Sequence, residues 1–379
     1  MKCLRCGNED KRYFYKDKDT YYCRKCIHFG RVNVGSLPKQ VVYKKPHKLC
    51  KVDLDYTLTR HQKRCVRELR ASVYGEQEVL VFAACGAGKT EIVMDSIMRY
   101  VNEGKKVGFA IARRQVVLEI KDRLQDAFKN LHIVAVCEGY TTQVDGDVIV
   151  CTMHQLYRYY KTFDLLIMDE IDAFPYAGNV MLENIAKLSC TGAFLYLSAT
   201  PDDALLKRVQ KGEVKKVELF VRPHGFPLIE PRMIIVPRWV QIFVAVYLYI
   251  KHKVQTLLFV PTIKDAKRYA SILWFLRPKV MTSKSKQKEA IMTAFRKQAF
   301  SLLICTTVLE RGITIHQVNV IILHSEHKVF QSASLMQMVG RVGRKKTNPF
   351  GCAYYIGNTR SKAMRESLHI IKEMNKDVI

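Results

Sequence analysis

Beyond residue 50, short apolar runs alternate with stretches in which apolar residues recur every three or four positions. The runs are rich in Val, Ile, Leu and Phe, and most contain no polar residue. Such runs are typical of strands buried on both faces, and helical patterns between them predict parallel sheets covered by helices. We expect eleven strands, at residues 79–82, 107–112, 133–136, 148–150, 165–168, 194–197, 233–236, 257–260, 302–305, 320–323 and 353–356.

The expected strands form two series, separated by a segment rich in Pro and Gly. This segment, Val-Arg-Pro-His-Gly-Phe-Pro at residues 221–227, predicts a hinge. Each series is long enough to bury a core of its own. We therefore expect an α/β protein with a first lobe at residues 51–220 and a second lobe at residues 221–379.

The composition is that of a globular protein. Of the 379 residues, 48% are hydrophobic and 26% are charged, which excludes wholesale disorder. The longest mainly apolar stretch, residues 239–250, is too short to cross a bilayer and contains Gln241. Lys2 and Arg5 stand where a signal peptide would need apolar residues. These features predict a cytoplasmic protein without a transmembrane segment of its own.

The net charge of +27 is unevenly distributed. Residues 1–50 carry 13 basic and 4 acidic side chains, residues 51–220 carry 23 of each, and residues 221–379 carry 26 basic and 8 acidic. A basic coat that served solubility alone would not divide in this way. The distribution predicts a polyanionic partner that meets both ends of the chain more than its neutral middle.

Four of the 12 cysteines form two close pairs near the start of the chain. Cys3 and Cys6 form one C-x-x-C pair, and Cys23 and Cys26 form the other, with sixteen residues between the pairs. This spacing is typical of a closed structural zinc site with four thiolate ligands, and the aromatic residues between the pairs predict a hairpin. Two disulfides are the alternative, which a reducing cytosol disfavours. We expect residues 1–50 to form a zinc ribbon and a linker.

The clearest chemical signal is the segment Ala-Ala-Cys-Gly-Ala-Gly-Lys-Thr at residues 83–90, between a predicted strand and a predicted helix. Gly86 and Gly88 allow backbone N–H groups to surround phosphate oxygens at a helix N-terminus. Lys89 is placed to reach the β- and γ-phosphates of a nucleotide, and Thr90 to hold Mg²⁺. The segment predicts a phosphate-binding loop.

An acidic motif follows about 80 residues later, directly after the apolar run 165–168. Asp169 at the end of a buried strand can hold Mg²⁺, and Glu170 can polarise the attacking water. We expect this strand to neighbour the strand of the phosphate loop. Ser198 and Thr200 close another strand, where their hydroxyls are placed to bond to the acidic motif.

The second lobe carries two further motifs. Residues 306–314, Thr-Thr-Val-Leu-Glu-Arg-Gly-Ile-Thr, follow an expected strand, and residues 337–344, Gln-Met-Val-Gly-Arg-Val-Gly-Arg, hold Arg341 and Arg344. We expect the two arginines to share one face of a helix because they are three residues apart. Guanidinium groups suit a transferring phosphoryl group better than ammonium groups do.

The ordered set of motifs resembles superfamily 2 helicases and translocases, which implies two RecA-like lobes and hydrolysis of ATP with Mg²⁺. The resemblance implies that Gln62 contacts adenine, that Gln337 belongs to the nucleotide site, and that Arg341 and Arg344 act as arginine fingers. It also implies that Arg113, Thr152 and Thr307 contact a nucleic-acid backbone. The phosphate loop then comprises Ala84, Cys85, Gly86, Ala87, Gly88, Lys89 and Thr90.

Within that superfamily, the octet Asp-Glu-Ile-Asp-Ala-Phe-Pro-Tyr at residues 169–176 and the four-cysteine ribbon resemble the late-competence ComFA family. That resemblance implies an ATPase that drives transforming single-stranded DNA into the cell. It also implies a place in the cytoplasm, at the inner face of the membrane, with competence proteins and a membrane DNA channel as partners. An oligomer is compatible with this interpretation.

Two alternatives stay open at this point. One is a DNA-repair, replication-restart or RNA helicase of the same superfamily, which nucleic-acid preference and duplex unwinding would distinguish. The other is a non-catalytic DNA-binding scaffold, against which the intact set Lys89, Asp169, Glu170, Arg341 and Arg344 argues.

Overall fold

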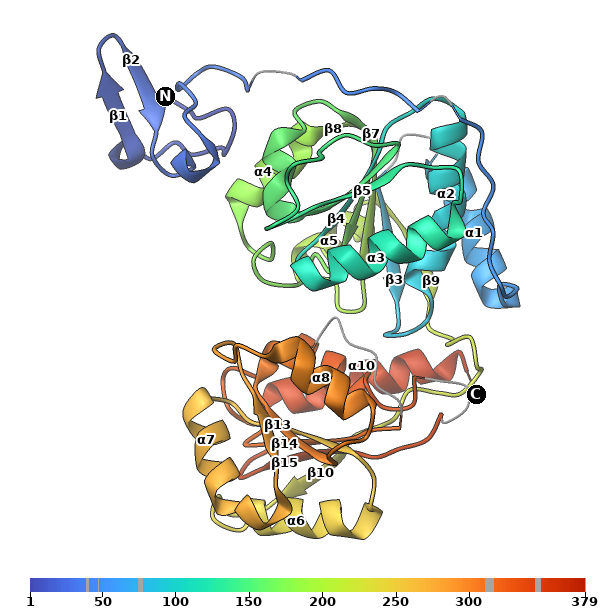
Figure 1. The fold of residues 1–379 in the computed structure, drawn as a ribbon, viewed down its shortest axis with the longest axis vertical. Coiled ribbons are helices and arrows are strands. Elements are labelled where there is room, and N and C mark those ends of the chain that lie inside the picture. Colours follow the sequence, from blue (N-terminus) through green and yellow to red (C-terminus); the bar gives the residue numbers. More distant parts are fainter. Residues whose placement is uncertain (39–40, 47, 74–77, 311–316, 345–348, 379) are drawn as a thin grey trace. The chain divides into compact units, whose positions relative to one another are not determined.

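The computed structural model describes the chain except for residues 39–40, 47, 74–77, 311–316, 345–348 and 379. It divides into two compact units (Figure 1). The first comprises Met1–Ala83 and Gly88–Leu219, and the second comprises Ala84–Ala87 and Phe220–Ile379.

The ribbon at the start of the first unit is a short antiparallel hairpin between two cysteine pairs. Strands β1 (Phe14–Asp17) and β2 (Thr20–Cys23) place Tyr15 opposite Tyr22. The short helices η1 (Lys11–Tyr13) and η2 (Ile27–Phe29) flank them. The predicted hairpin is confirmed.

The first lobe is built on a seven-stranded parallel sheet of order β5-β6-β4-β7-β8-β3-β9. Helices lie on both sides of this sheet, with α4 on one side and α1 and α2 on the other (Figure 1). The strands are β3 (Glu78–Ala83), β4 (Val107–Ile111), β5 (Ile133–Val136), β6 (Val148–Thr152), β7 (Phe163–Asp169), β8 (Cys190–Ser198) and β9 (Val214–Leu219). The helices are α1 (Arg60–Val73), α2 (Lys89–Asn102), α3 (Arg114–Ala127), η3 (Met153–Arg158), α4 (Val180–Ser189) and α5 (Asp203–Gln210).

The core of this lobe forms where apolar strands meet apolar helix faces. All five residues of β4 are buried. Gly108 in β4 lies so close to the ring of Phe163 that a Cβ there would overlap it, at 2.9 Å from the ring carbons. Burial of large apolar side chains such as Tyr159 and Phe163 stabilises each by about 2–3 kcal/mol. This packing fixes the strand ends from which the candidate site is built.

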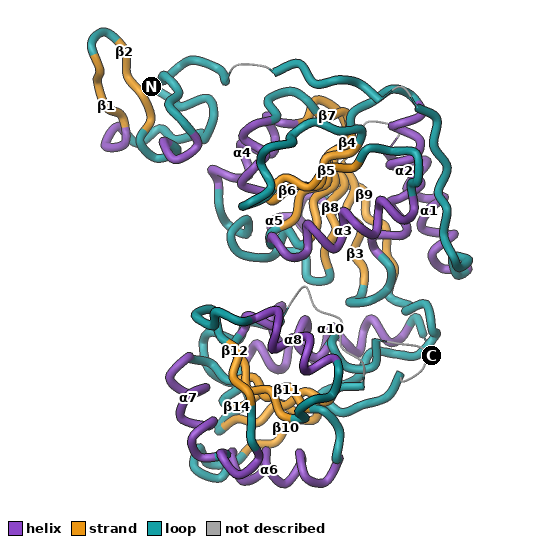
Figure 2. The backbone as a smooth tube through the Cα atoms, in the orientation of Figure 1, coloured by secondary structure: helices purple, strands orange, loops and turns teal. Residues whose placement is uncertain are grey.

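The second lobe repeats the design on a six-stranded parallel sheet of order β10-β15-β14-β11-β13-β12 (Figure 2). Its strands are β10 (Arg232–Ile235), β11 (Thr256–Phe259), β12 (Lys279–Met281), β13 (Leu302–Cys305), β14 (Asn319–Leu323) and β15 (Ala353–Gly357). Its helices are α6 (Gln241–His252), α7 (Ile263–Ile272), η4 (Trp274–Leu276), α8 (Lys288–Arg296), η5 (Thr307–Leu309), α9 (Ser332–Val339) and α10 (Lys362–Lys376). None of the helices in the described part of the chain is both long and apolar enough to cross a membrane.

All eleven predicted strands are confirmed, and the two parallel α/β lobes with them. Two strands were not predicted, β9 and β12, and each lies at the edge of its sheet. In β9 the solvated edge exposes Lys215 and Lys216, so its sequence lacks a continuous apolar run, and β12 has only three residues, the first of them an exposed lysine.

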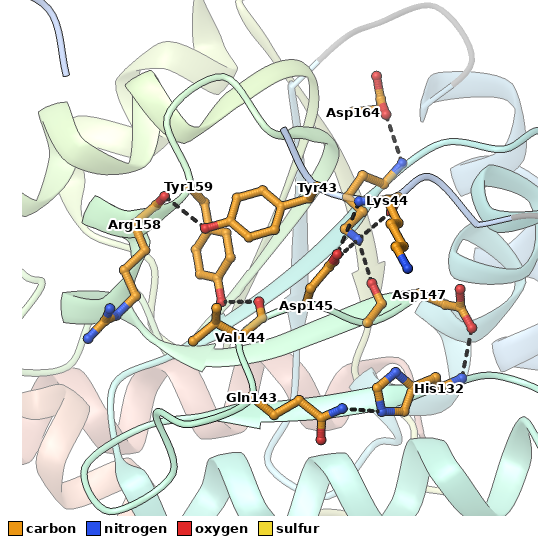
Figure 3. A network of polar contacts seen from close by, with 12 residues as sticks. Tyr43, Lys44, His132, Gln143, Val144, Asp145, Asp147, Arg158, Tyr159 and Asp164 are labelled. Atoms are coloured by element: carbon orange, nitrogen blue, oxygen red, sulfur yellow. Dashed lines mark hydrogen bonds and ion pairs between the residues drawn. The ribbon is translucent and has the colours of Figure 1, made fainter. Parts of the chain in front are cut away.

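The connector that follows the ribbon is bound to the first lobe by polar contacts (Figure 3). The Tyr43 hydroxyl donates to the carbonyl of Arg158 at 3.2 Å, and the Lys44 amide donates to Asp145 at 3.1 Å. The buried ammonium of Lys106 donates to the carbonyl of Lys44 at 2.7 Å and to Asp145 at 2.6 Å. A buried ammonium is stabilised only when paired and hydrogen-bonded in this way, so these contacts position the connector on the lobe.

Candidate active site and metal centre

The predicted phosphate-binding loop has the expected strand–loop–helix context. Strand β3 ends at Ala83 and helix α2 begins at Lys89. Gly86 and Gly88 have φ angles of 81° and 92°, in the left-handed region that glycine adopts without strain. Thr90 is buried in the first turn of α2, where backbone N–H groups and the helix dipole favour an anion.

Gln62 lies against this loop from helix α1. Its side-chain oxygen accepts from the Thr59 amide at 3.0 Å, and the Gln62 amide donates to the Thr59 hydroxyl at 3.3 Å. A Cβ at Gly88 would lie 2.3 Å from the side-chain nitrogen of Gln62, so the two residues pack closely, and the φ angle of 92° favours glycine at this position. Gln62 therefore packs directly against Gly88 of the loop.

The acidic motif lies at the carboxyl end of β7. Asp169 is buried, and this burial raises the pKa of its carboxyl group to about 6, against the lowering effect of nearby Lys89 and with a further rise from Glu170. The Glu170 backbone is left-handed, with φ of 56°, and its amide donates to the carbonyl of Leu197 at 3.0 Å. Such a conformation costs about 1 kcal/mol or more in a non-glycine residue and is found at functional sites.

The expectation that β7 neighbours β3 is wrong. Strand β8 lies between them. The intervening strand is the one that ends in Ser198, so the hydroxyl motif stands between the phosphate loop and the acidic motif along the edge of the sheet. Sequence order does not report this insertion, because parallel sheets are not ordered by chain position.

The predicted contact between the hydroxyl motif and the acidic motif is present. The Ser198 hydroxyl donates to one carboxylate oxygen of Asp172 at 2.8 Å, and the Thr200 hydroxyl donates to the other at 2.6 Å. The Thr200 amide donates to the Ser198 hydroxyl at 2.9 Å. Asp172 is therefore held by one donor in the last residue of β8 and one just after it, which couples the position of the acidic loop to the end of β8.

The residues expected to contact a nucleic-acid backbone in the first lobe lie at this same edge. The pairing of β6, β4 and β7 places Thr152 beside Ile111, and Ile111 beside Asp169. Arg113 follows β4 and precedes the first residue of α3. Because the carboxyl ends of parallel strands form the binding edge of an α/β sheet, Arg113 and Thr152 have the placement that such contacts need.

The helix predicted to carry both Arg341 and Arg344 in the second lobe is wrong. Helix α9 ends at Val339, so Arg341 and Arg344 do not share a helix face. The chain turns at Gly340–Gly343, and Gly343 adopts a left-handed φ of 65°, which ends helical geometry. Arg341 is buried and donates to the carbonyl of Glu310 at 2.6 Å, whereas Arg344 is half-buried.

The remaining second-lobe predictions are placed in part. Gln337 is buried in α9, and Thr307 begins η5 directly after β13. Residues 311–314 of the predicted motif at 306–314 lie outside the described residues.

Sequence reasoning assigned no role to Arg222, which lies in the expected hinge. Its side chain is 1% exposed and donates to the carbonyls of Val342 at 3.0 Å, Gly343 at 2.9 Å and Gly340 at 3.2 Å. Burial, with a smaller effect of Arg344, lowers the pKa of its guanidinium to about 10. Arg222 thus fixes the turn that carries Arg341 and Arg344, and its place before Pro223 in the expected hinge gave no sign of this role in the sequence.

The four predicted cysteine ligands converge at one point in the ribbon. Cys3, Cys6, Cys23 and Cys26 are buried, and their sulfur atoms all lie within 4.8 Å of one another. The Sγ–Sγ distances are 3.8 Å for Cys3–Cys26 and 3.7 Å for Cys6–Cys23. Tetrahedral zinc with Zn–S bonds of about 2.3 Å separates its sulfurs by about 3.8 Å, so the cluster fits one zinc ion. These sulfurs are too far apart for disulfides, whose S–S bond is about 2.05 Å.

Families of known proteins match the ribbon, the first lobe and the second lobe, in that order along the chain. Residues 1–37 match the Competence protein ComFA N-terminal domain, residues 55–203 match the type III restriction enzyme res subunit, and residues 240–346 match the helicase conserved C-terminal domain. Competence protein ComFA of Bacillus subtilis is 32% identical over 99% of this chain and 86% of that protein. The ComFA protein of Streptococcus pneumoniae is 33% identical over 99% of this chain and 90% of that protein.

The chain belongs to the ComFA family. It is therefore a superfamily 2 helicase protein with a helicase-type ATPase fold, for which ATP and Mg²⁺ are the implied cofactors. Solved structures of two other proteins agree on the fold of two parallel-sheet lobes. The helicase RecG bound to a three-way DNA junction superposes with a TM-score of 0.59 at 21% identity, covering 88% of this chain and 49% of RecG. Yeast Dbp5 bound to RNA and ADP BeF3 superposes with a TM-score of 0.60 at 16% identity, covering 84% of this chain and 92% of Dbp5.

Proposed function

We propose that the protein is an ATP-driven motor that moves along single-stranded DNA and drives transforming DNA into the cell. The observation that carries the proposal is the arrangement at one edge of the first sheet. There Lys89 and Thr90 begin the helix after β3, Asp169 ends β7 with Glu170 directly after it, and Asp172 is hydrogen-bonded to the end of β8 between these strands. The competence relatives supply the cellular role.

In this proposal the first lobe binds and activates ATP. Lys89 binds the β- and γ-phosphates, Gln62 contacts the adenine, and Glu170 polarises the attacking water. Thr90 and Asp169 would hold Mg²⁺, which neutralises charge on the phosphates when bound. The pKa of Asp169, raised by burial, fits a carboxylate that is stabilised by a cation.

In this proposal the second lobe supplies positive charge to the nucleotide and a second set of contacts to the DNA. Arg341 and Arg344 stabilise the transferring phosphoryl group, and Gln337 belongs to the nucleotide site. Arg113 and Thr152 in the first lobe and Thr307 in the second lobe contact the DNA backbone. The hydrolysis cycle changes the distance between these two sets of contacts. Partner proteins of the competence system, a membrane channel and a place at the inner face of the membrane stay predictions from the resemblance.

The proposal predicts which nucleic acid stimulates hydrolysis. Phosphate release should rise by about tenfold or more with single-stranded DNA, and less with duplex DNA or RNA. Stimulation should weaken steeply between 50 and 200 mM salt, because backbone contacts release counterions. Steady-state phosphate release across these three nucleic acids at the two salt concentrations measures it. Preferential stimulation by RNA would favour an RNA helicase, and a rate that no nucleic acid changes would favour a scaffold.

A further inference from the structure

A groove lies where the ribbon and its connector meet helix η3 of the first lobe. Its volume is about 650 Å³. The residues that line it include three arginines and three aromatic residues, and none of the described lining residues is acidic: Arg5, Arg31, Arg158, Phe29, Tyr43 and Tyr157. A positive groove lined by aromatic rings is the chemistry that binds single-stranded nucleic acids.

The aromatic rings form a stacked surface across the contact of ribbon and lobe. Phe29 from the ribbon stacks on Tyr157 from η3, with ring centroids 4.9 Å apart and an angle of 27° between the planes. The Arg158 guanidinium lies 5.0 Å from the centroid of the Tyr157 ring. Rings and guanidinium planes in this arrangement offer flat faces on which a base can stack.

The positive charges of the groove differ in their availability. Arg5 is buried and donates to the carbonyls of Cys26 and Gly30, at 2.6 Å each, so it serves the ribbon fold. Arg31 is exposed, lies 4.7 Å from the Tyr22 ring centroid and forms an ion pair with Asp17. Arg158 is half-buried beside Tyr157. Arg31 and Arg158 are therefore the two groups placed to meet phosphates.

The groove lies close in the chain to Thr152, which the proposed function places in contact with the DNA backbone. Helix η3 begins directly after Thr152, and Tyr157 and Arg158 are its last two residues. A helix of this type rises about 2 Å per residue, so the groove begins roughly 10–12 Å from Thr152. The ring of His154, in the same helix, lies 6.3 Å from the Phe29 ring.

We propose that this groove binds single-stranded DNA, with a base stacked on Tyr157 and Phe29 and phosphates held by Arg31 and Arg158. The proposal rests on the proposed function and extends it, because the ribbon then becomes a third holding point that lengthens the contact beyond Thr152. It also accounts for the excess of basic residues in the ribbon. The proposed hydrolysis of ATP uses none of these residues, whereas binding of a DNA backbone would use them.

The first test removes the two positive charges from the full-length chain. Binding of a fluorescein-labelled oligothymidine of 20 nucleotides is measured by anisotropy without ATP, at several salt concentrations. The double variant Arg31→Gln, Arg158→Gln should bind about tenfold more weakly, and its salt slope should fall by about 1.4 for two lost phosphate contacts. The matched control is Arg67→Gln, Lys215→Gln, which removes two exposed charges of the same lobe outside the groove. Equal affinity and slope in the two double variants would overturn the proposal.

The second test separates stacking from charge and folding. Tyr157→Phe keeps the ring and should bind like wild type, whereas Tyr157→Leu keeps apolar packing on Phe29 and should bind about tenfold more weakly. Equal binding by Phe and Leu would overturn the stacking role. These measurements also distinguish the two proposals. If DNA binding depends on the groove but DNA does not stimulate hydrolysis by the wild-type protein, the motor function is contradicted and the DNA-binding site in the groove is supported. An equal loss of binding for labelled oligouridine would assign the groove to single strands of both kinds.

Discussion

Replacement of Lys89 by Ala is expected to lower the rate of ATP hydrolysis by about a thousandfold or more. Lys89 begins helix α2 directly after the glycine loop and lies close enough to the buried Asp169 to affect its pKa. Its ammonium is the single positive charge that the phosphate loop itself supplies to the nucleotide. Phosphate release at saturating ATP and single-stranded DNA measures the loss.

The control for this prediction is Lys215→Ala. Lys215 is exposed on the edge strand β9 of the same lobe, so its loss removes an equal charge without touching the loop. Both variants should unfold at temperatures close to that of wild type, because neither side chain is part of the core. A Lys89→Ala variant that retains more than a tenth of the wild-type rate would contradict the assignment of the loop.

Loss of the metal is expected to unfold the ribbon and leave the lobes folded. The ribbon's buried cluster consists of the four cysteines with partly buried Phe14, Phe29 and Val34, against which Met181 of α4 packs, and this is too little apolar surface to offset the entropy of folding. Structural zinc contributes about 10–16 kcal/mol in comparable small sites. We expect about one zinc per chain in the wild-type protein, and none in Cys26→Ser, whose residues 1–37 should become sensitive to proteolysis.

The matched control is Cys352→Ser, since Cys352 is half-buried in the second lobe and lies outside the cluster. That variant should retain its zinc and its resistance to proteolysis. Full zinc content in Cys26→Ser, or wild-type protein with well under one zinc per chain, would show that the four sulfurs do not form the site.

The main elements of the fold could be predicted because buried parallel strands have a simple signature. Continuous runs such as Leu-Leu-Ile-Met before Asp169 can be recognised without knowledge of the fold. The edge strands β9 and β12 could not, because partial exposure permits polar residues such as Lys215 and Lys216 within a strand. The position of β8 between β3 and β7 also had no local signature, since strand order depends on how crossovers pack.

The same division applies to the candidate site. Local motifs predicted the phosphate loop and the bonds from Ser198 and Thr200 to the acidic loop. The helix expected around Arg341 and Arg344 was wrong because Gly340 and Gly343 permit a turn that the three-residue spacing of the arginines conceals. Arg222 and Tyr157 were missed for a different reason: their contacts join segments far apart in the chain, such as Arg222 with Val342 and Tyr157 with Phe29.

Movement along single-stranded DNA is measured by displacement of streptavidin from biotinylated oligonucleotides. Oligonucleotides biotinylated at the 5′ or the 3′ end are compared, with and without ATP, for wild type and Lys89→Ala. We expect ATP to accelerate displacement from one end by at least about tenfold, and Lys89→Ala to abolish this acceleration. Hydrolysis stimulated by DNA without faster displacement from either end would contradict a translocase.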